Sequence, residues 1–315
     1  MKRILMCGVA AMLASLQCGA CALCGCSSSN NYLGVLPDFY TNFFGLQYQY
    51  RSFTSFRPAN FDYRGESSSV SHESYNTALL WGRFYVSKNV HLFVFVPVVS
   101  NSKLEDGVRA NTQGIGDASV LANVTLVNRT NKGGWQHTLQ AGGGVKTPTG
   151  KYQSLQDVVL SDQVVPNMQP GTGSWDLLFN ANYTVRKGGY GINLDAGYNA
   201  NTPNAQQYKY GNHFNTSLNG VYWLQRNKWT VMPEIGLRYE NTAMDYDNYS
   251  KGWVDSYTGG YFLYATAGAY VYYKRMGLHA MYTIPTSQHY ATGLVTAHNQ
   301  FETGLYVLLN RQNKK

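Results

Sequence analysis

Apolar and polar residues alternate one by one along most of the chain after residue 42. In residues 190–199, YGINLDAGYN, the apolar side chains fall on one parity, and glycine, asparagine and aspartate fall on the other. Residues 229–240, WTVMPEIGLRYE, repeat the pattern. Successive side chains of a strand point to opposite faces, so a period of two indicates β-strands with one apolar and one polar face. Runs of about ten residues are long enough to cross a membrane at a tilt.

The alternation and the turn residues between the runs predict twelve strands, with ten or fourteen as the alternatives. The predicted ranges are 42–53, 72–87, 90–100, 115–128, 134–147, 172–187, 189–200, 212–225, 228–241, 259–273, 276–287 and 297–309. Connections after even-numbered strands are short and those after odd-numbered strands are long, for example 54–71, 101–114 and 148–171. All short turns therefore share one side. This pattern predicts an all-β fold, a transmembrane antiparallel up-and-down β-barrel with short periplasmic turns and long extracellular loops.

A soluble β-sandwich would show the same alternation with shorter strands. Aromatic residues near the ends of the apolar sets favour the membrane barrel, since such residues form girdles at the membrane interfaces. They are Trp175, Tyr190, Tyr198, Trp229, Tyr239, Tyr261 and Tyr273.

The composition agrees with this class. Charged residues make up 13% of the chain, against roughly 25% in soluble domains. The formal net charge is +8, but no basic cluster suited to nucleic acid is present, so no nucleic-acid partner is expected.

The first residues have the features of an export signal. A basic start is followed by the apolar run 4–16, which is too short to span a bilayer, and by the small-residue pattern Ala20-Cys21-Ala22. We therefore predict a signal peptide over 1–22 and a location in the cell outer membrane. Lipidation at Cys18 or Cys21 is the alternative.

The mature chain would comprise a periplasmic lead-in, 23–41, and a barrel, 42–315. The lead-in contains Cys24-Gly25-Cys26. Thiolates suit copper(I) or zinc, but two ligands make half a site, so Cys24 and Cys26 are weak metal candidates. No cofactor is expected.

Three glycine-rich segments carry a family resemblance: GIGDASVLANVTL (114–126), AGGGVKTPTGKY (141–152) and PGTGSWDLLFNANYTVRKGGYGINLDAGY (170–198). They resemble the outer-membrane barrels labelled MetA-pathway of phenol degradation, which are related to hydrophobic-compound transporters. The resemblance implies a barrel and a transport role for a small hydrophobic or aromatic solute.

Parity places a mixed set of charges on the polar, lumen-facing side. These candidates are Arg51, Arg83, Asp117, Lys146, Asp176, Arg186, Asp195, Glu234, Arg238, Glu240 and Glu302. Two hypotheses stay open for them: they line a narrow polar passage for a solute, or they form a charge network that braces the barrel, because isolated buried charges are costly.

The sequence thus predicts a porin-like outer-membrane channel or transporter, whose partners are membrane lipid, the outer-membrane insertion machinery and an unidentified small solute. One alternative is a non-conducting scaffold or adhesin that acts through its Tyr/Asp-rich outer loops. The other alternative, which we favour less, is a lipid hydrolase that would use Ser287 with His289 or Ser217 with His213. We therefore expect no enzyme activity.

Overall fold

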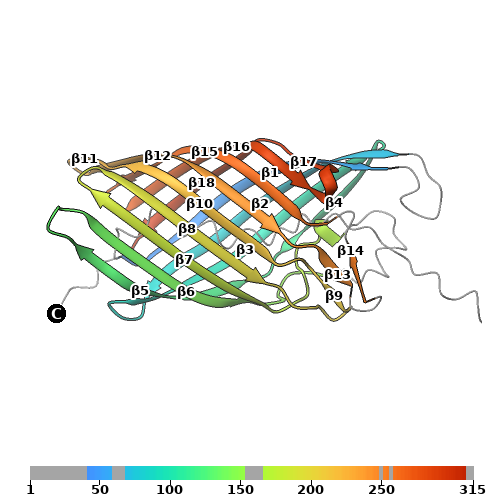
Figure 1. Ribbon diagram of the computed structural model, residues 1–315, viewed down its shortest axis with the longest axis horizontal. Helices are drawn as coiled ribbons and strands as arrows, with labels where there is room; N and C mark the ends of the chain where they lie inside the picture. The colour runs from blue at the N-terminus through green and yellow to red at the C-terminus, as the bar shows by residue number, and fades with distance from the viewer. Residues whose placement is uncertain (1–40, 59–67, 153–165, 248–250, 255–257, 310–315) are drawn as a thin grey trace, which may run out of the picture.

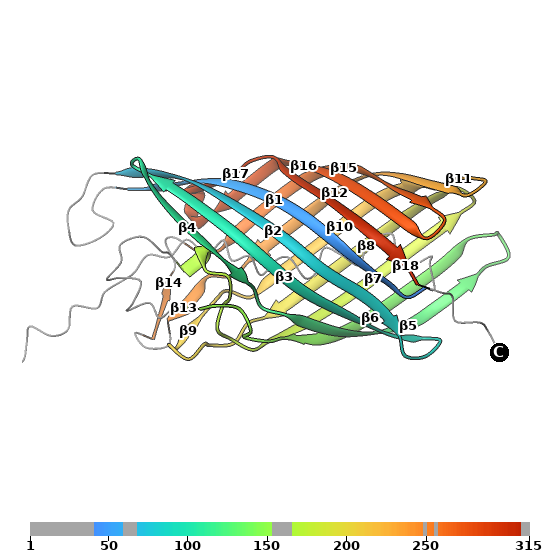
Figure 2. The ribbon, with the colours of Figure 1, turned by 180° about the vertical axis from the view of Figure 1, so that it is seen from behind.

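The computed structural model describes residues 41–58, 68–152, 166–247, 251–254 and 258–309. These residues form a closed antiparallel barrel of twelve strands, tilted against its long axis (Figures 1 and 2). The predicted fold class and strand number are therefore confirmed. Within the described ranges, no helix has the length and apolar character needed to cross a membrane. The predictions for residues 1–22 and for most of 23–41 lie outside the described residues.

Nine of the twelve wall positions are single strands. Each of the other three holds two consecutive strands separated by a short interruption: β4 and β5, β10 and β11, and β17 and β18. The bounds are β1 (Phe43–Arg57), β2 (Ser69–Tyr85), β3 (Val90–Glu105), β4 (Val108–Ile115), β5 (Ser119–Thr130), β6 (Gln136–Lys146), β7 (Asp176–Lys187), β8 (Tyr190–Ala200), β10 (His213–Tyr222), β11 (Leu224–Arg226), β12 (Trp229–Thr242), β15 (Gly260–Tyr273), β16 (Met276–Tyr290), β17 (Val295–Ala297) and β18 (Gln300–Leu308).

The barrel closes by pairing its first strand with its last. Residues Phe43 to Tyr50 of β1 lie antiparallel to Leu308 to Phe301 of β18 in an uninterrupted register. Farther along β1, Phe53 to Ser55 pair with β17. This seam leaves neither β1 nor β18 as a free sheet edge.

The predicted loop 101–114 is wrong for most of its length. β3 and β4 continue as a regular hairpin in which Val98 to Glu105 pair with Ile115 to Val108. Asp106 and Gly107 form the turn with positive φ angles of 49° and 82°. An Asp-Gly pair supplies these angles at low cost and fixes a tight hairpin. The sequence pattern favours a loop here because polar residues occupy both faces of this extension, at the extracellular end of the barrel. The alternation of apolar and polar residues that marks the other strands is therefore lost.

A separate three-stranded sheet stands at the extracellular end. It consists of β9 (Tyr208–Lys209), β13 (Asp245–Asp247) and β14 (Gly252–Val254), in the order β14-β13-β9. Segments predicted as two irregular loops thus pair with each other.

Inward side chains form two apolar clusters, one toward each end of the barrel. The cluster near the periplasmic turns contains Phe43, Trp81, Phe95 and Tyr306 among its buried members. Trp81 stacks on Phe95 at a ring separation of 5.8 Å. The extracellular cluster contains Phe53, Tyr75, Met168, Phe262, Tyr264 and Tyr290. The interior is polar between these two layers.

Large inward side chains lie against glycines of the neighbouring strand. A Cβ atom added to Gly277 would lie 2.6 Å from a ring carbon of Tyr272, and one added to Gly45 would lie 2.6 Å from the ring of Tyr306. Both distances are far below van der Waals contact. These glycines therefore let aromatic rings lie flat against the wall, a known way of stabilising glycines in sheets.

We expect Gly277→Ala to destabilise the barrel by about 1–3 kcal/mol, the usual cost of overpacking a filled interior. The matched control is Gly220→Ala on the outer face, where the nearest atom to the new Cβ is 3.9 Å away. The control should change stability by less than about 0.5 kcal/mol. Urea unfolding from phospholipid vesicles, followed by tryptophan fluorescence, measures both. Equal effects would show that ring packing does not require Gly277.

Candidate functional site: the interior of the barrel

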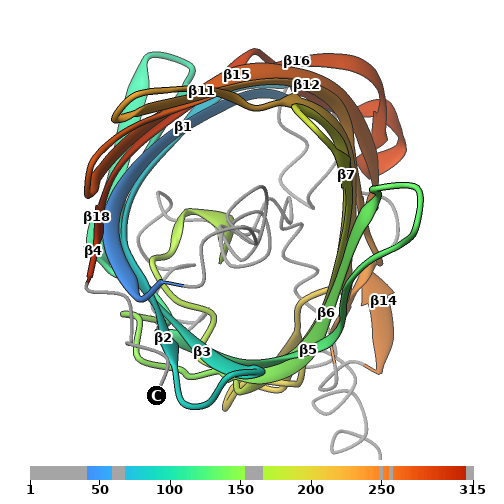
Figure 3. The same cartoon turned by 90° about the vertical axis from the view of Figure 1, so that its left-hand side faces the viewer.

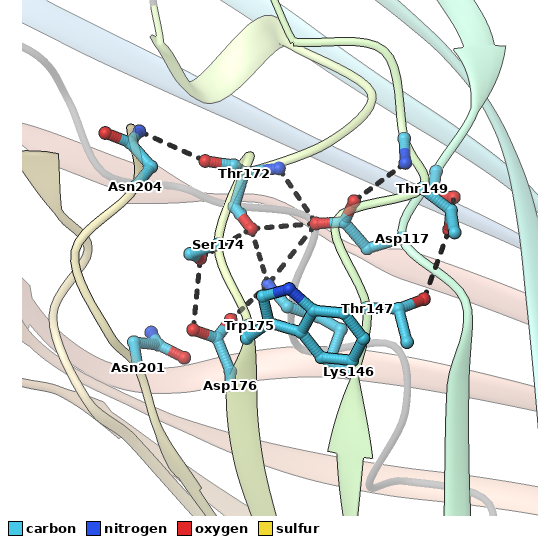
Figure 4. A network of polar contacts seen from close by, with 12 residues as sticks. Asp117, Lys146, Thr147, Thr149, Thr172, Ser174, Trp175, Asp176, Asn201 and Asn204 are labelled. Carbon is cyan, nitrogen blue, oxygen red and sulfur yellow. Dashed lines mark hydrogen bonds and ion pairs between the residues drawn. The ribbon is translucent and has the colours of Figure 1, made fainter. Parts of the chain in front are cut away.

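The three glycine-rich motifs meet at one place near the extracellular end. Asp117 comes from the first motif, Lys146 from the second, and Thr172 and Asp176 from the third (Figure 4). Lys146 Nζ lies 3.4 Å from Asp117 Oδ2, forms an ion pair with Asp176, and donates to Thr172 Oγ1 at 2.7 Å. The cation therefore joins two carboxylates contributed by segments before β5 and on β7.

Backbone and hydroxyl donors complete this network. Asp117 accepts from Gly150 N at 2.9 Å, from Thr172 N at 2.8 Å and from Thr172 Oγ1 at 2.7 Å. Asp176 accepts from Ser174 Oγ at 3.0 Å. Charge-assisted bonds of this kind are stronger than neutral ones, so the motif residues hold three wall segments together.

Two of the motif glycines are required by the close approach of their chains. A Cβ on Gly150 would lie 2.7 Å from Gly171 Cα, and a Cβ on Gly171 would lie 2.7 Å from Gly150 Cα. Any side chain at either position would push the two segments apart. The glycine signature therefore has a steric cause here and does not mark a phosphate-binding loop.

A second network crosses the interior between strands that are not neighbours. Arg51 on β1 pairs with Glu240 on β12 at 3.3 Å, and Arg238 Nε lies 3.1 Å from the same Glu240 oxygen. Arg238 also donates to Gln300 Oε1 at 2.8 Å, and Gln300 donates to the Tyr264 hydroxyl at 3.1 Å. In the sheet, β18, β16 and β15 separate β1 from β12. The Arg51–Glu240 ion pair therefore spans part of the barrel's cross-section.

A third group surrounds Glu302. Its Oε1 lies 2.7 Å from His279 Nε2, and the His279 Nδ1 atom lies 2.5 Å from the Tyr306 hydroxyl. A carboxylate only accepts, so Nε2 donates to Glu302, and in the neutral imidazole Nδ1 then accepts from Tyr306. Gln49 donates to the other Glu302 oxygen at 3.3 Å. The absence of a side chain at Gly304 leaves space for the His279 ring, because a Cβ atom there would lie 2.8 Å from His279 Nδ1.

The other predicted charges have different surroundings. Asp195 is buried and accepts from Asn182 Nδ2 at 3.0 Å. Arg83, which is 1% exposed, donates to the Thr41 carbonyl and lies over the ring of Phe43. Arg186 stacks on Trp223 with its guanidinium carbon 4.6 Å from the ring centre. Glu234 is buried, and one of its oxygens has no hydrogen-bond partner among the described residues.

Several buried interior amides also lack hydrogen-bond partners among the described residues. Both polar side-chain atoms are unpaired there in Gln47, Asn123, Asn167 and Asn180. Asn123 and Asn180 lie opposite Gly142 from its two sides, so they belong to one row across β5, β6 and β7. Buried polar groups are normally satisfied, so this row is suited to water or to a polar group of a solute.

Some interior residues were missed by the sequence reading. His279 could have been found, because it alternates with the outward Leu278 and Ala280. Glu73 accepts from Ser55, Ser71 and Tyr75. Its strand gave little signal there, since polar residues occupy both faces from Ser71 to Ser74.

Part of the 148–171 connection enters the barrel. The 3-10 turn η3 (Pro166–Met168) lies inside the ring of strands when the barrel is viewed along its axis (Figure 3). Met168 is fully buried in the extracellular apolar cluster, and its carbonyl accepts from Asn101 Nδ2 at 3.0 Å and from Thr112. η3 therefore narrows the extracellular half of the interior.

The described residues contain no cluster of histidine, cysteine and carboxylate side chains that could hold a metal ion. Cys24 and Cys26 lie outside the described residues. Of the serine–histidine pairs considered for catalysis, Ser217 and His213 are four residues apart on β10, which is about 14 Å along a strand. His213 Nδ1 instead lies 2.9 Å from Thr242 Oγ1. The ring of His289 lies 6.5 Å from the ring of Tyr261, measured between their centres.

The closed wall and polar interior define this chain as an outer-membrane type of β-barrel. No family model and no curated protein matches the sequence. Among solved structures, the COG4313 outer membrane channel from Pseudomonas putida F1 is similar, with a TM-score of 0.60, 14% identity, and coverage of 85% of this chain and 96% of that one. The expected resemblance to barrels of the MetA-pathway phenol-degradation type is thus confirmed in the fold.

Two further structures give lower scores. The transport unit of the autotransporter AIDA-I from Escherichia coli has a TM-score of 0.48 at 8% identity, covering 89% of this chain and 94% of that one. A Pseudomonas aeruginosa FadL homologue has a TM-score of 0.41 at 10% identity, covering 85% and 90%. Scores below 0.5 support no closer comparison.

Replacing Lys146 with methionine should destabilise the barrel by about 3–5 kcal/mol, because Asp117 and Asp176 would keep buried charges without their cation. The triple variant Asp117→Asn, Lys146→Met, Asp176→Asn should recover part of this loss. Urea unfolding midpoints measure the difference. Lys151→Met, which changes an exposed lysine of the same connection, is the control and should be neutral. An unchanged unfolding midpoint in Lys146→Met would show that the ion pairs contribute nothing to stability.

The extracellular sheet should respond to pH through Asp245. This buried carboxyl accepts from Tyr208 and from Gly211 N, and burial raises its pKa to about 7 from the ordinary 3.8. The folded sheet therefore retains a proton that the unfolded segment loses above about pH 4, so its stability falls as the pH rises through that window toward 7.

Hydrogen exchange at Gly211 and its neighbours should consequently accelerate between about pH 4 and 7 by more than the intrinsic chemical rate, and the excess should level off above about pH 7. Asp245→Asn should remove the excess pH dependence. The β7–β8 hairpin in the wall provides an internal reference. Identical pH profiles for the wild type and Asp245→Asn would contradict the assignment.

Proposed function

We propose that this protein is an outer-membrane channel for small solutes that combine an aromatic or apolar group with a polar one. The observation that carries the proposal is the inner face of β15 and its neighbours. Aromatic rings of β15 and β16 line it toward both ends. Farther round the wall, on β1, the polar side chains of Gln47, Gln49 and Arg51 lie between Phe43 and Phe53, and the Gln47 amide has no hydrogen-bond partner among the described residues. A solute of mixed character would find apolar contacts at both mouths and hydrogen bonds in the middle.

At each of the two levels, the aromatic rings contact one another. At the extracellular level, Phe262 stacks on Tyr290 at 4.9 Å and lies 5.9 Å from Phe53. At the periplasmic level, Tyr270 stacks on His279 at 5.0 Å, and His279 lies 5.6 Å from Tyr306. The similarity of fold to a solved outer membrane channel supports the same proposal.

The mixed signs of the interior charges argue against strong selection for anions or cations. A selective pore surrounds the ion with one sign of charge. Here Arg51 and Arg238 share Glu240, and Lys146 lies between two aspartates. We propose that the Arg51–Glu240 pair and η3 limit the size of the solute, and that the wall residues set its chemistry.

A planar bilayer recording tests the channel directly. The folded, reconstituted protein should give discrete current steps in potassium chloride at neutral pH. Phenol and benzoate should then block these steps in a concentration-dependent way. Folded protein without steps, identified by its heat-dependent gel mobility, would contradict an open channel. It would favour the scaffold alternative, which the ordered extracellular sheet β14-β13-β9 supports.

Phe262→Ala should weaken block by phenol about three- to tenfold, because losing one ring contact costs about 0.5–1.5 kcal/mol. The control is Tyr261→Ala, at the preceding residue of the same strand, whose side chain lies on the outer face. Phenol should block the current of that variant as strongly as it blocks the wild type. Equal weakening in both variants would show that the interior ring does not contact the solute.

A further inference from the structure

The five short turns at the periplasmic end carry only positive charge. Residues 86–89, 129–135, 186–189, 225–228 and 274–276 contain no aspartate or glutamate. Their cations are Lys88, Arg129, Lys132, Arg186, Lys187, Arg226, Lys228, Lys274 and Arg275. All except Arg186 are exposed. The extracellular end, by contrast, mixes both signs, as Glu105, Arg109 and Lys151 illustrate.

A hollow in the outer face of the wall lies beside this positive rim. It has a volume of about 860 Å³ and is formed by the β7–β8 turn, β10 and β12. Its lining is mostly apolar and includes Trp135, Tyr190, Ile192, Tyr222 and Ile235. The charged residues of the lining are Lys187, which is exposed, and Glu234, which is buried. We call it the periplasmic groove.

Glycines create the depth of the groove. Gly188 and Gly189 form the turn at one end, and Gly220 lies on β10 between Ile192 of β8 and Ile235 of β12. The nearest atom to a Cβ added at Gly220 would be 3.9 Å away. Because Gly220 has no side chain, a depression remains on the outer face between two exposed isoleucines.

A cation and an aromatic border lie at the mouth of the groove. Lys187 Nζ lies 5.3 Å from the centre of the Trp135 ring, and both residues line the groove. Tyr190 and Tyr222 pack with their rings 4.6 Å apart. Tryptophan and tyrosine settle at the headgroup level of a membrane, so the Lys187 ammonium would lie where lipid phosphates lie.

We propose that the periplasmic groove binds an anionic glycerophospholipid of the periplasmic leaflet. An acyl chain lies along Ile192, Gly220 and Ile235, and the phosphate lies beside Lys187. The other cations of the rim add a positive potential of one sign, which favours a headgroup with net negative charge over a zwitterionic one. The apolar groove selects a lipid tail over a free anion, because a free phosphate would leave this surface unused.

Native mass spectrometry of the detergent-solubilised full chain tests the proposal. The protein is mixed with equal amounts of phosphatidylglycerol and phosphatidylcholine that carry the same acyl chains. The wild type should retain phosphatidylglycerol preferentially. Lys187→Gln should reduce its retention about fivefold, as expected for losing about 1 kcal/mol per cation near a headgroup. The double variant Arg226→Gln, Lys228→Gln should reduce it further by lowering the potential of the rim.

Two variants separate the tail from the headgroup. Gly220→Leu should fill the groove and reduce the retention of both lipids. Lys151→Gln at the extracellular end removes the same charge far from the groove and should leave retention unchanged. Equal retention of the two lipids by the wild type, or equal effects of Lys187→Gln and Lys151→Gln, would overturn the headgroup assignment. Unchanged retention in Gly220→Leu would overturn the groove. Heat-dependent gel mobility checks that each variant is folded.

Discussion

The pairing of β1 with β18 is the interaction on which the rest of the structure depends. In a hydrocarbon layer every backbone N–H and C=O group must find a partner within the protein, and a sheet meets this condition only when it has no edge. Closure also fixes which parity of each strand faces inward. A shift of one residue at the seam would turn every side chain of β1 to the opposite face. The uninterrupted register from Phe43 to Tyr50 against Leu308 to Phe301 therefore positions the charged residues as well as the wall.

Closure creates a second demand, since inward side chains share a confined space. The chain meets it by placing small residues beside large ones in neighbouring strands. Gly45 and Gly277 lie next to Tyr306 and Tyr272, and Gly304 lies next to His279. The chain has 32 glycines and 26 tyrosines, and in these contacts a glycine leaves the space that a ring occupies.

The wall could be predicted from the sequence because it depends on a local signal. Alternation with period two persists in each strand, and turn residues mark the short connections. The β3–β4 extension was missed where that contrast fades, although Asp106-Gly107 gave a turn signal of its own. Parity also predicted which face Arg51 and Glu240 occupy. It could not predict that they meet, because a contact between β1 and β12 depends on the curvature of the whole barrel. The meeting of the three glycine motifs around Lys146 was likewise not predictable from any one segment.

The interior charges divide into two kinds by the strands they connect. Lys146 on β6 joins Asp117 and Asp176 along the wall, between neighbouring strands. Arg51 and Glu240 join strands that are separated by three others, so their contact reduces the cross-section. Bracing and solute selection therefore need not compete for the same residues. A charge paired with its neighbour in the wall stabilises closure, whereas a charge paired across the interior would also limit the size of the solute in the channel that we propose.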